Sequence, residues 1–465
     1  MASKSKRARM APQRNLSKTF MYWAIAIFVV KLIIIFNIQG GNIDISGRPF
    51  LVDRIWLGSD GENYLKGYDA LSREGVFSKV AILNYWPAGY PLVILLLSIL
   101  SKSWVLTTLS LVQSAIFSFA AYLFASQLSR TRLKKFAHLV FILIILNPTL
   151  SLVSIWIGYE SLTASGFLIA VGLIIKDFIE KDDKKFIRYL FINSVIFGVL
   201  TFMQPRLVIS GILINTLWVL ARKGSKAGTL LVIASLVVTL FFPATLIYRN
   251  HKALGINSIS TNLGVTMNIG AGDNANGGYM KKDYGVPCKT NGTAVQQDNQ
   301  RVRCVLDWYV SNPTKAIKLF YNKTLYFWSP WLNNGFLGGD VNIGTMSRNP
   351  WLKIDPVISI ASTPDGGKLV YGSFGKLISW LWLLSGLALL IYGYLILWRQ
   401  NSLERFIANI AMIAISTNWL ISLISIGDHR FRVPIMGMSL FLQAVGLRTL
   451  FKGGKAQMVE GPTLR

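Results

Sequence analysis

The sequence is poor in acids and in the residues that soluble enzymes use for chemistry. Charged residues make up only 15% of its 465 residues, with 21 Asp and Glu against 48 Lys and Arg. Three histidines far apart in the chain leave too few ligands for a His-based metal site. A phosphate-binding G-x-x-x-x-G-K-[ST] loop, a dinucleotide-binding fingerprint and an H-E-x-x-H motif are all missing. The common soluble-enzyme motifs are therefore excluded.

What the sequence has in abundance is apolar residues, at 52%, with a mean hydropathy of +0.45. A helix needs roughly 20 apolar residues to cross a bilayer, and the chain offers many such runs between short basic loops. We therefore expect an all-α polytopic membrane protein with about ten transmembrane helices, an external loop helix after the first span and a mixed external insert. The expected spans lie near residues 19–38, 104–128, 136–155, 161–178, 188–205, 207–221, 227–248, 373–398, 405–426 and 434–451.

Two hydrophobic runs need separate treatment. The first span follows a basic start, is long for a signal-peptide core and contains Lys31, which favours a retained signal anchor over a cleaved signal peptide. The run "PAGYPLVILLLSIL" is too short to cross, so we expect it to be interfacial or re-entrant.

The formal net charge of +27 first suggests a nucleic-acid partner, but membrane topology explains it better. Short Lys/Arg-rich turns mark the cytoplasmic side of a membrane protein, where they meet anionic lipid headgroups. With the N-terminus inside, these turns fall on one side, except for the basic "GDHRFR", which falls outside. The expected order is a cytoplasmic tail (1–18), a membrane bundle (19–248) with an external acidic loop (40–103), an extracytoplasmic insert (249–372), C-terminal membrane helices (373–451) and a cytoplasmic tail (452–465).

The external insert contains both cysteines, Cys288 and Cys304. A pair of cysteines on an oxidising face indicates a disulfide, with two free thiols as the alternative. The Gly/Asn-rich residues 257–279 indicate a series of turns. Residues 307–328 indicate a helix with a cap-like start at "SNPTKA", whose Lys and aromatic content suits the membrane surface.

Acids gather in one place, the stretch "SDGENYLKGYDAL" after the first span, which begins with Asp60 and Glu62. A carboxylate beside apolar surface is partly desolvated, which raises its pKa and suits proton abstraction. The alternative is a solvated loop acid, or a cap supplied by Ser59 or Asp60 to a helix from about Glu62. Tyr64, Leu65, Tyr68 and Leu71 would share one face of that helix.

Several arginines lie at the external ends of expected helices. Arginine binds phosphate through a planar fork, so such a set suits a phosphate leaving group, although each side chain alone could also reach lipid headgroups. Glu160, at another external boundary, could pair with one of them. The candidate donor-binding residues are Glu160, Arg206, Arg249, Arg430 and Arg432.

In their order and spacing these motifs resemble the GT-C superfamily of membrane glycosyltransferases, over nearly the whole chain. The similarity is greatest to the bacterial branch related to protein O-mannosyltransferases and the lipid A aminoarabinose transferase. It rests on "SDGENYLKGYDALSREGVF" followed by "WPAGYPL", on "GYESL", on "YRNH" with the Gly/Asn-rich run after it, and on "HRFRVPI".

The resemblance implies an inverting transfer of a hexosyl or pentosyl group from a polyprenyl-phosphate donor on the outer face of the cell membrane. The family's catalytic Asp falls on Asp60, as general base for an acceptor hydroxyl on a protein, glycan or lipid. Many members have two adjacent acids here, whereas this chain has "DGE". Glu62 is then either the second acid from a shifted position or only a first-turn acid. The "STNLG" run also departs from the family's pattern, which leaves the donor sugar open.

Two other functions are compatible with the sequence: a transporter or flippase of a lipid-linked saccharide, and a non-catalytic assembly partner. Transporters usually show paired repeats and charged or broken helices at the midplane, and Lys31 is the main feature of that kind here. Membrane lipids are expected contacts and nucleic acid is not. No cofactor is assigned, and the sequence leaves a divalent-metal requirement open.

Overall fold

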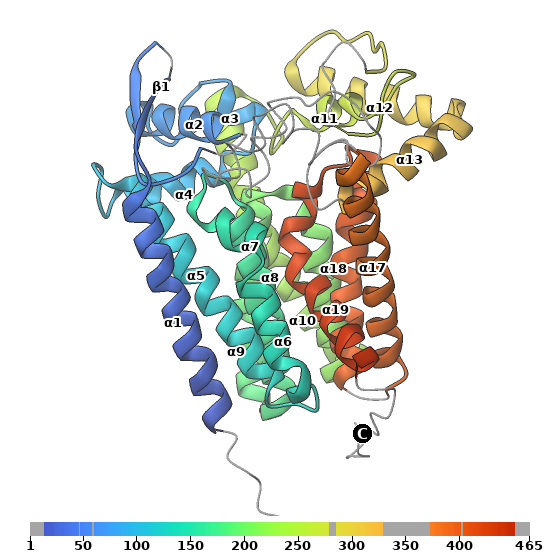
Figure 1. Cartoon of the computed structure of the whole chain (residues 1–465). Helices are drawn as coiled ribbons and strands as arrows, with labels where there is room; N and C mark the ends of the chain where they lie inside the picture. Colours follow the sequence, from blue (N-terminus) through green and yellow to red (C-terminus); the bar gives the residue numbers. More distant parts are fainter. Residues whose placement is uncertain are drawn as a thin grey trace, which may run out of the picture.

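The protein is a bundle of membrane-length helices with a layer of shorter elements on one end (Figure 1). A computed structural model of the chain describes residues 14–45, 47–57, 60–278, 285–328, 373–400 and 403–451. Both expected tails lie largely outside these ranges, as does much of the expected insert. Within the described residues the structure confirms an all-α, multi-pass membrane protein.

Eight helical stretches in the described part are long and apolar enough to cross a membrane, and a bent pair makes a ninth. These stretches are formed by α1 (Arg14–Asn37), α5 (Val105–Leu128), α8 (Glu160–Glu180), α9 (Asp183–Met203), η2 (Pro205–Leu207) with α10 (Val208–Leu254), α17 (Ser373–Trp398), α18 (Leu403–Ile424) and η5 (His429–Ile435) with α19 (Met436–Phe451). The bent pair consists of α6 (Lys134–Ile145) and α7 (Pro148–Leu152) with η1 (Val153–Ile155).

Helix α10 is a hairpin and not one long rod. Its backbone leaves the helical region at Gly224, where φ is +69°, a conformation that suits glycine. Asn215 Nδ2 donates to Ser235 Oγ at 3.1 Å, so residues on the two sides of Gly224 lie next to each other. Each arm is long enough for a crossing. Among the described residues this raises the number of crossings to ten, as the sequence predicts.

The expected single span over residues 136–155 is wrong in one respect, because the helix breaks. The axes of its two pieces differ by 57°. Pro148 starts the second piece, and Asn147 caps it by accepting a hydrogen bond from Leu150 N at 3.0 Å. Proline disfavours a helical conformation at the preceding residue, which accounts for the break.

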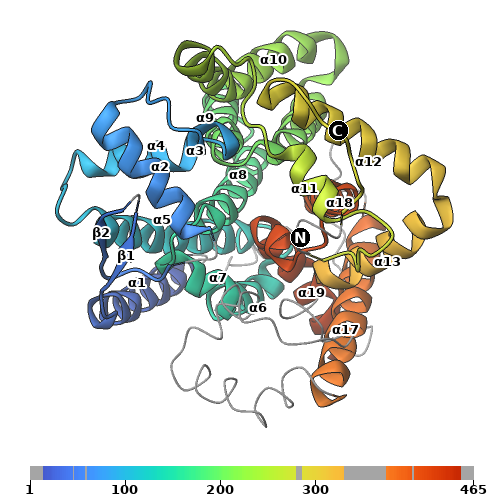
Figure 2. The same cartoon turned by 90° about the horizontal axis from the view of Figure 1, so that it is seen from above.

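Shorter elements cover one end of the bundle, and we call them the loop layer. Figures 1 and 2 show that they come from two separate parts of the chain, on opposite sides of the same end. The first group comprises β1 (Gly41–Asp44), β2 (Pro49–Val52), α2 (Gly61–Glu74), α3 (Ile82–Tyr85) and α4 (Gly89–Ser98). The second group comprises α11 (Leu263–Ile269), α12 (Ala294–Ser311) and α13 (Pro313–Trp328).

Several expectations for the loop layer hold. Helix α2 buries the predicted face of Tyr64, Leu65, Tyr68 and Leu71. The short apolar run forms the ten-residue helix α4, too short to cross. The antiparallel hairpin of β1 and β2 was not predicted. Helix α13 begins at Pro313 as expected, but α12 extends well before residue 307, and α11 interrupts the expected series of turns.

Cys288 and Cys304 form a disulfide with a Cα–Cα distance of 5.9 Å, as predicted. It ties the loop before α12 to the third turn of that helix. The loop layer therefore has a covalent link across its second group.

Lys31 faces the bundle interior and not the lipid. Its ammonium group donates to the carbonyl of Ser151 at 2.8 Å and to Ser154 Oγ at 2.6 Å, and it lies 4.2 Å from the ring centroid of Phe117. These contacts link α1 to α7 and η1 of the bent pair, so Lys31 has a structural role in the bundle.

Candidate functional site

Two carboxylates and one guanidinium meet where the bundle joins the loop layer. Arg430 binds Asp60 through Nη1 and Glu160 through Nε. Exposed fractions of the three side chains are only 10% for Arg430, 14% for Asp60 and 3% for Glu160. We call Asp60, Glu160 and Arg430 the charged triad. The Arg430 guanidinium thus forms ion pairs with both carboxylates.

Backbone pairing brings the two acids together. Trp56 N donates to Ile155 O at 2.9 Å, and Ile157 N donates back to Trp56 O at 2.9 Å. This bridge aligns the segment before Asp60 with the segment before Glu160, although the two segments are about a hundred residues apart. Each acid then follows its bridged residue, Trp56 or Trp156, by four positions.

A buried network fixes the turn that carries Glu160. The hydroxyl of Tyr90 accepts a hydrogen bond from Gly158 N at 2.9 Å and donates to Gln113 Oε1 at 3.0 Å. Gln113 Nε2 in turn donates to the carbonyl of Trp156 at 3.0 Å. A side chain at Gly158 would collide with the carboxylate of Glu160, so this close approach requires glycine. The Glu160 carboxylate is thus held in place before any ligand binds.

Tyrosines surround the triad. Tyr64 accepts a hydrogen bond of 3.4 Å from Arg430 Nη2, and the Tyr159 ring centroid lies 5.4 Å from the Arg430 guanidinium carbon. Burial raises the pKa of Tyr64 and of Tyr159 above the ordinary value, with charges of neighbouring groups as smaller causes. Both hydroxyls therefore stay protonated near neutral pH and remain available as hydrogen-bond donors.

Arg206 lies beside this cluster, among the charges of Arg430, Glu160 and Asp428. Its guanidinium stacks on the ring of Phe431, 3.6 Å from the centroid. All three of its nitrogens are buried, and within the described ranges none has a hydrogen-bond partner. Buried guanidinium groups normally donate several hydrogen bonds, so this arrangement is suited to an anionic ligand.

Glu62 and Asp60 point to different surroundings. Glu62 forms an exposed ion pair with Lys66 on the same helix, at 2.5 Å, so the structure does not bring it to the triad. Asp60 occupies the N-cap position of α2, but its side chain makes no capping hydrogen bond. The capping alternative for Asp60 is therefore wrong, because its carboxylate binds Arg430 instead. Ser59, the other expected cap, lies outside the described residues.

Two of the candidate arginines make structural contacts. Arg249 donates from Nε to Val76 O at 2.9 Å and from Nη2 to Ser78 O, which ties α10 to the loop after α2. Arg432 donates from Nη1 to Trp328 O at 2.7 Å, at the end of α13. These bonds to backbone carbonyls favour a role in holding the loop layer over the predicted contact with a donor phosphate.

The arrangement does not fit a metal ion held by the two acids. Arg430 occupies the position between them that a divalent cation would need. Among the described residues there is also no group of three or more His, Cys, Asp or Glu side chains that could hold a metal.

Sequence reasoning missed some members of the site. Asp428 accepts a hydrogen bond from Arg430 N at 2.8 Å and so shapes the turn that presents Arg430. Tyr90, Gln113 and Tyr159 were not singled out either. Tyr90 lies in "PAGYPL" and Tyr159 in "GYESL". The sequence motifs therefore included both tyrosines but did not indicate what either side chain contacts.

No protein-family model matches the chain, and a search of curated proteins found no match either. Among solved structures, the chain is similar to an oligosaccharyltransferase of Archaeoglobus fulgidus tethered with an acceptor peptide, at 12% identity and a TM-score of 0.43. That similarity covers 93% of this chain and 50% of the other. It is also similar to AglB of the same organism in complex with an inhibitory peptide and a dolichol-phosphate, at 13% identity and a TM-score of 0.42, over 96% of this chain and 53% of that one. The chain thus spans about half the length of the solved structures it matches.

Proposed function

We propose that this protein is a membrane glycosyltransferase of the GT-C type. In this proposal it moves a hexosyl or pentosyl group from a polyprenyl-phosphate donor to an acceptor hydroxyl. The observation that carries the proposal is the charged triad, placed at the boundary between bundle and loop layer with the unpaired guanidinium of Arg206 beside it. The sequence motifs that resemble the GT-C superfamily include the three triad residues, whereas Arg206 lies outside them.

Each group has a role in one displacement step. The acceptor oxygen attacks the anomeric carbon, and a new C–O bond forms on the face opposite the phosphate. The bond between that carbon and the phosphate oxygen breaks, and its electron pair leaves with polyprenyl phosphate. Asp60 takes the proton of the acceptor hydroxyl. Because attack is from the opposite face, the configuration at the anomeric carbon inverts.

Arg206 and Arg430 serve the leaving group. The Arg206 guanidinium, whose nitrogens have no hydrogen-bond partner among the described residues, can bind phosphate oxygens with two parallel hydrogen bonds, and Arg430 adds a second fixed positive charge. Charge grows on the phosphate as the bond breaks, so a fixed cation there stabilises the transition state more than the bound donor. Glu160 then holds Arg430 in position and offsets its charge.

The proposed setting is the outer face of the cell membrane. A donor with a polyprenyl tail stays in the bilayer, and its phosphate lies at headgroup depth. Asp60 directly precedes α2 and Glu160 starts α8, so the triad lies where the bundle meets the loop layer, and the proposal sets the donor phosphate at this level. A protein, a glycan or a lipid is the acceptor.

The test is a transfer assay with purified protein in lipid, a radiolabelled polyprenyl-phosphate sugar and a crude extract of cell-envelope acceptors. The expected result is label in a water-soluble or glycolipid product, together with release of polyprenyl phosphate. A transporter would instead move intact donor across the bilayer of a vesicle without cleaving it. Donor translocation without any transfer would overturn the proposal.

A further inference from the structure

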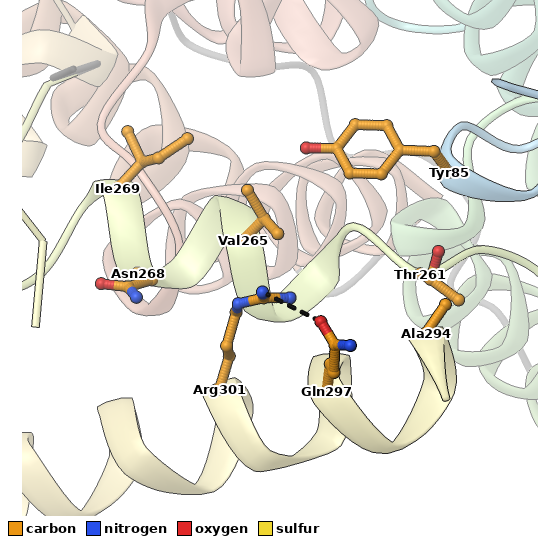
Figure 3. A pocket seen from close by; sticks show the side chains of 8 residues that line it. All are labelled: Tyr85, Thr261, Val265, Asn268, Ile269, Ala294, Gln297 and Arg301. Carbon is orange, nitrogen blue, oxygen red and sulfur yellow. Dashed lines mark hydrogen bonds between the residues drawn. The ribbon is translucent and has the colours of Figure 1, made fainter. Parts of the chain in front are cut away.

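A cavity lies in the loop layer, and none of the residues that line it belongs to the charged triad. Its volume is about 360 Å³, which falls within the roughly 300–1,000 Å³ of small-molecule sites. Figure 3 shows Tyr85 on one side, and Arg301 and Gln297 rising from α12 on the other. The cavity is lined by Tyr85, Thr261, Val265, Asn268, Ile269, Ala294, Gln297 and Arg301.

The cavity is built where the two groups of the loop layer are fastened together. Thr261 N donates to Asn84 O at 2.9 Å, and Asn84 Nδ2 donates to Thr261 Oγ1 at 3.3 Å. Tyr85 follows Asn84 directly, so this contact sets its position opposite α12. On the α12 side, the disulfide at Cys304 fixes the helix one turn beyond Arg301. The walls are thus held before a ligand arrives, which lowers the entropic cost of binding.

Several polar groups that line the cavity make only long hydrogen bonds, or none, to other described residues. Arg301 Nη2 makes two long hydrogen bonds of 3.4 Å, to Thr290 Oγ1 and to Gln297 Oε1. Gln297 Nε2 donates to Gly292 O at 2.9 Å, which orients its amide. The side-chain oxygen of Asn268 is buried and has no partner among the described residues. Planar amide and guanidinium groups with spare hydrogen-bonding capacity can bind adjacent hydroxyls in pairs.

The chemistry of the lining favours a sugar over a charged ligand or a lipid. A pyranose presents hydroxyls at its edge and C–H groups on its faces. The ring of Tyr85 offers an apolar surface for such a face, with the polar groups of α11 and α12 across from it. Asp298, the nearby acid, accepts a hydrogen bond from Gly264 N at 2.8 Å, so this oxygen is already used within the protein.

Helix α11 lies between the cavity and the segment that precedes Arg430. Helix α11 lines the cavity with Val265, Asn268 and Ile269. Its next residue, Gly270, packs so closely on Ser425 and Ile426 that a Cβ at this position would overlap the Ser425 carbonyl. That segment leads within five residues to Arg430. A ligand in the cavity therefore lies on the other side of α11 from the segment that presents the triad.

We propose that this cavity binds a saccharide unit of the acceptor, so that the acceptor is a glycan; this identification rests on the proposed function. The donor sugar is unsuited to the cavity, because its phosphate must remain with Arg206 and Arg430 at membrane depth. A saccharide one or more units from the attacked hydroxyl would be held here, while the hydroxyl itself reaches Asp60.

The experiment measures binding without catalysis. Full-length Asp60→Asn protein in lipid nanodiscs is titrated with short neutral hexose oligosaccharides, and binding is followed by saturation-transfer NMR. We expect Arg301→Gln and Tyr85→Ala each to weaken binding at least tenfold. The matched control is Arg303→Gln, an exposed arginine two residues along α12, which should leave binding unchanged. Thermal stability and the intact disulfide show that each variant is folded.

The outcomes separate this proposal from the proposed function. Oligosaccharide binding that all three variants retain equally, or no binding at all, overturns the saccharide site. Binding of a Ser/Thr-rich peptide that Arg301→Gln abolishes, without oligosaccharide binding, also overturns it and indicates a peptide acceptor. Since binding is measured in an Asp60→Asn background, oligosaccharide binding without any transfer by the wild-type protein would overturn only the proposed function.

Discussion

At the scale of single residues, Arg430 is the group on which the site depends. It forms ion pairs with two acids, Glu160 on α8 and Asp60 at the start of α2. Removing one partner of a buried ion pair costs roughly 3–5 kcal/mol, because the remaining charge has no compensation. Arg430 is therefore unsuited as a test of catalysis, since its loss would damage folding and chemistry together.

Asp60→Asn gives a cleaner test. Arg430 keeps Glu160 as its partner, so we expect the variant to fold with nearly unchanged thermal stability. An amide has the shape of the carboxylate but cannot accept the acceptor's proton. Loss of a general base typically lowers the rate about 10² to 10⁴-fold, and this drop in kcat is the expected result. Sugar transfer is measured with protein reconstituted in lipid.

The control for Asp60 is Glu62→Gln. Glu62 pairs only with exposed Lys66 in the described structure, and exposed pairs contribute little. We therefore expect activity within about twofold of wild type. A severe loss in Glu62→Gln, comparable to that of Asp60→Asn, would show that Glu62 shares the catalytic role. Wild-type transfer by a folded Asp60→Asn protein would falsify the base assignment.

Arg206→Met should weaken the donor interaction. The side chain keeps its stem against Phe431 but loses the guanidinium, whose nitrogens have no hydrogen-bond partner within the described residues. A hydrogen bond to a charged group contributes about 1.5–3 kcal/mol, so kcat/KM for the donor should fall about ten- to a hundredfold. The measurement is initial rate at limiting donor concentration.

Arg249→Met is the matched comparison. Its guanidinium holds the carbonyls of Val76 and Ser78, so its loss should lower Tm and leave kcat/KM of the folded protein nearly unchanged. The reverse pattern, with a stable Arg249→Met protein that has lost donor affinity, would restore Arg249 as a phosphate ligand and contradict the structural role.

At the scale of elements, Lys323 joins α13 to the loop after α18. Its ammonium group donates to Tyr309 Oη at 2.7 Å, to Leu423 O at 2.9 Å and to Ser425 O at 2.6 Å. Burial lowers the pKa of Lys323 to about 7 and raises the pKa of the neighbouring Tyr309. The junction between α13 and the end of α18 therefore contains a lysine whose positive charge is costly to bury near neutral pH.

This burial predicts how stability depends on pH. In the unfolded chain Lys323 titrates near pH 10.4, so between about pH 7 and 10.4 the unfolded state binds more protons than the folded state. Stability should then rise with pH across this window, by at most about 1.4 kcal/mol per pH unit, and the full cost is present below about pH 7. Lys323→Met should flatten the rise of Tm with pH.

The control for Lys323 is Lys318→Met, an exposed lysine on the same helix. It should leave the slope of Tm against pH unchanged. An identical slope in the wild type and in Lys323→Met would contradict the assignment of the pH dependence to this lysine.

The disulfide stabilises the second group of the loop layer. Cys288 and Cys304 are 16 residues apart, and closing a loop of this size contributes roughly 3 kcal/mol in the chain-entropy model. Thiol counting on unreduced, unfolded protein should find no free thiol. Cys288→Ser should increase hydrogen exchange in α12 and its preceding loop while leaving α5 and α8 protected. Equal protection of α12 in both proteins would mean that the bond is not needed for its order.

An element could be predicted well where the residues that cause it lie close together in the sequence. The apolar residues that define a membrane span follow one another in the sequence, so hydropathy alone predicted ten crossings. The break at Pro148 and the start of α12 have local signals too, a proline and a Thr293–Gln296 capping box, which were not weighed. The turn at Gly224 was predicted only as a loop between two spans. In each case the local chemistry was present in the sequence.

At the scale of the whole molecule, the site could be predicted only in part. Asp60 lies 370 residues from Arg430, and Arg430 lies 270 residues from Glu160. No periodicity connects positions so far apart, so the sequence supplied candidates and a family resemblance but no pairing. The structure separates Arg206, which lies beside the triad, from Arg249 and Arg432, which hold the loop layer in place. That distinction depends on tertiary contacts alone.

The basic turns predict the orientation of the whole molecule in the membrane. The loop layer occupies one end of the bundle, and α1 begins and α19 ends at the other, with the Lys/Arg-rich turns around residues 130–135 and 182–188 (Figure 1). The sequence showed one exception, "GDHRFR", a basic segment on the loop-layer side. Its arginines are buried, where Arg430 neutralises Asp60 and Glu160 and Arg432 binds Trp328. They cannot act as free charges at the membrane surface, so the exception does not weigh against the rule.

We therefore predict that the loop layer is extracytoplasmic. In intact cells, a membrane-impermeant maleimide should label Asn274→Cys, at an exposed position of the loop layer. It should not label Lys184→Cys, at an exposed position in the first turn of α9, until the membrane is permeabilised. The native cysteines form a disulfide and give no background. Labelling of Lys184→Cys from outside, with protection of Asn274→Cys, would place the triad on the cytoplasmic side and would contradict the proposed outer-face transfer as well.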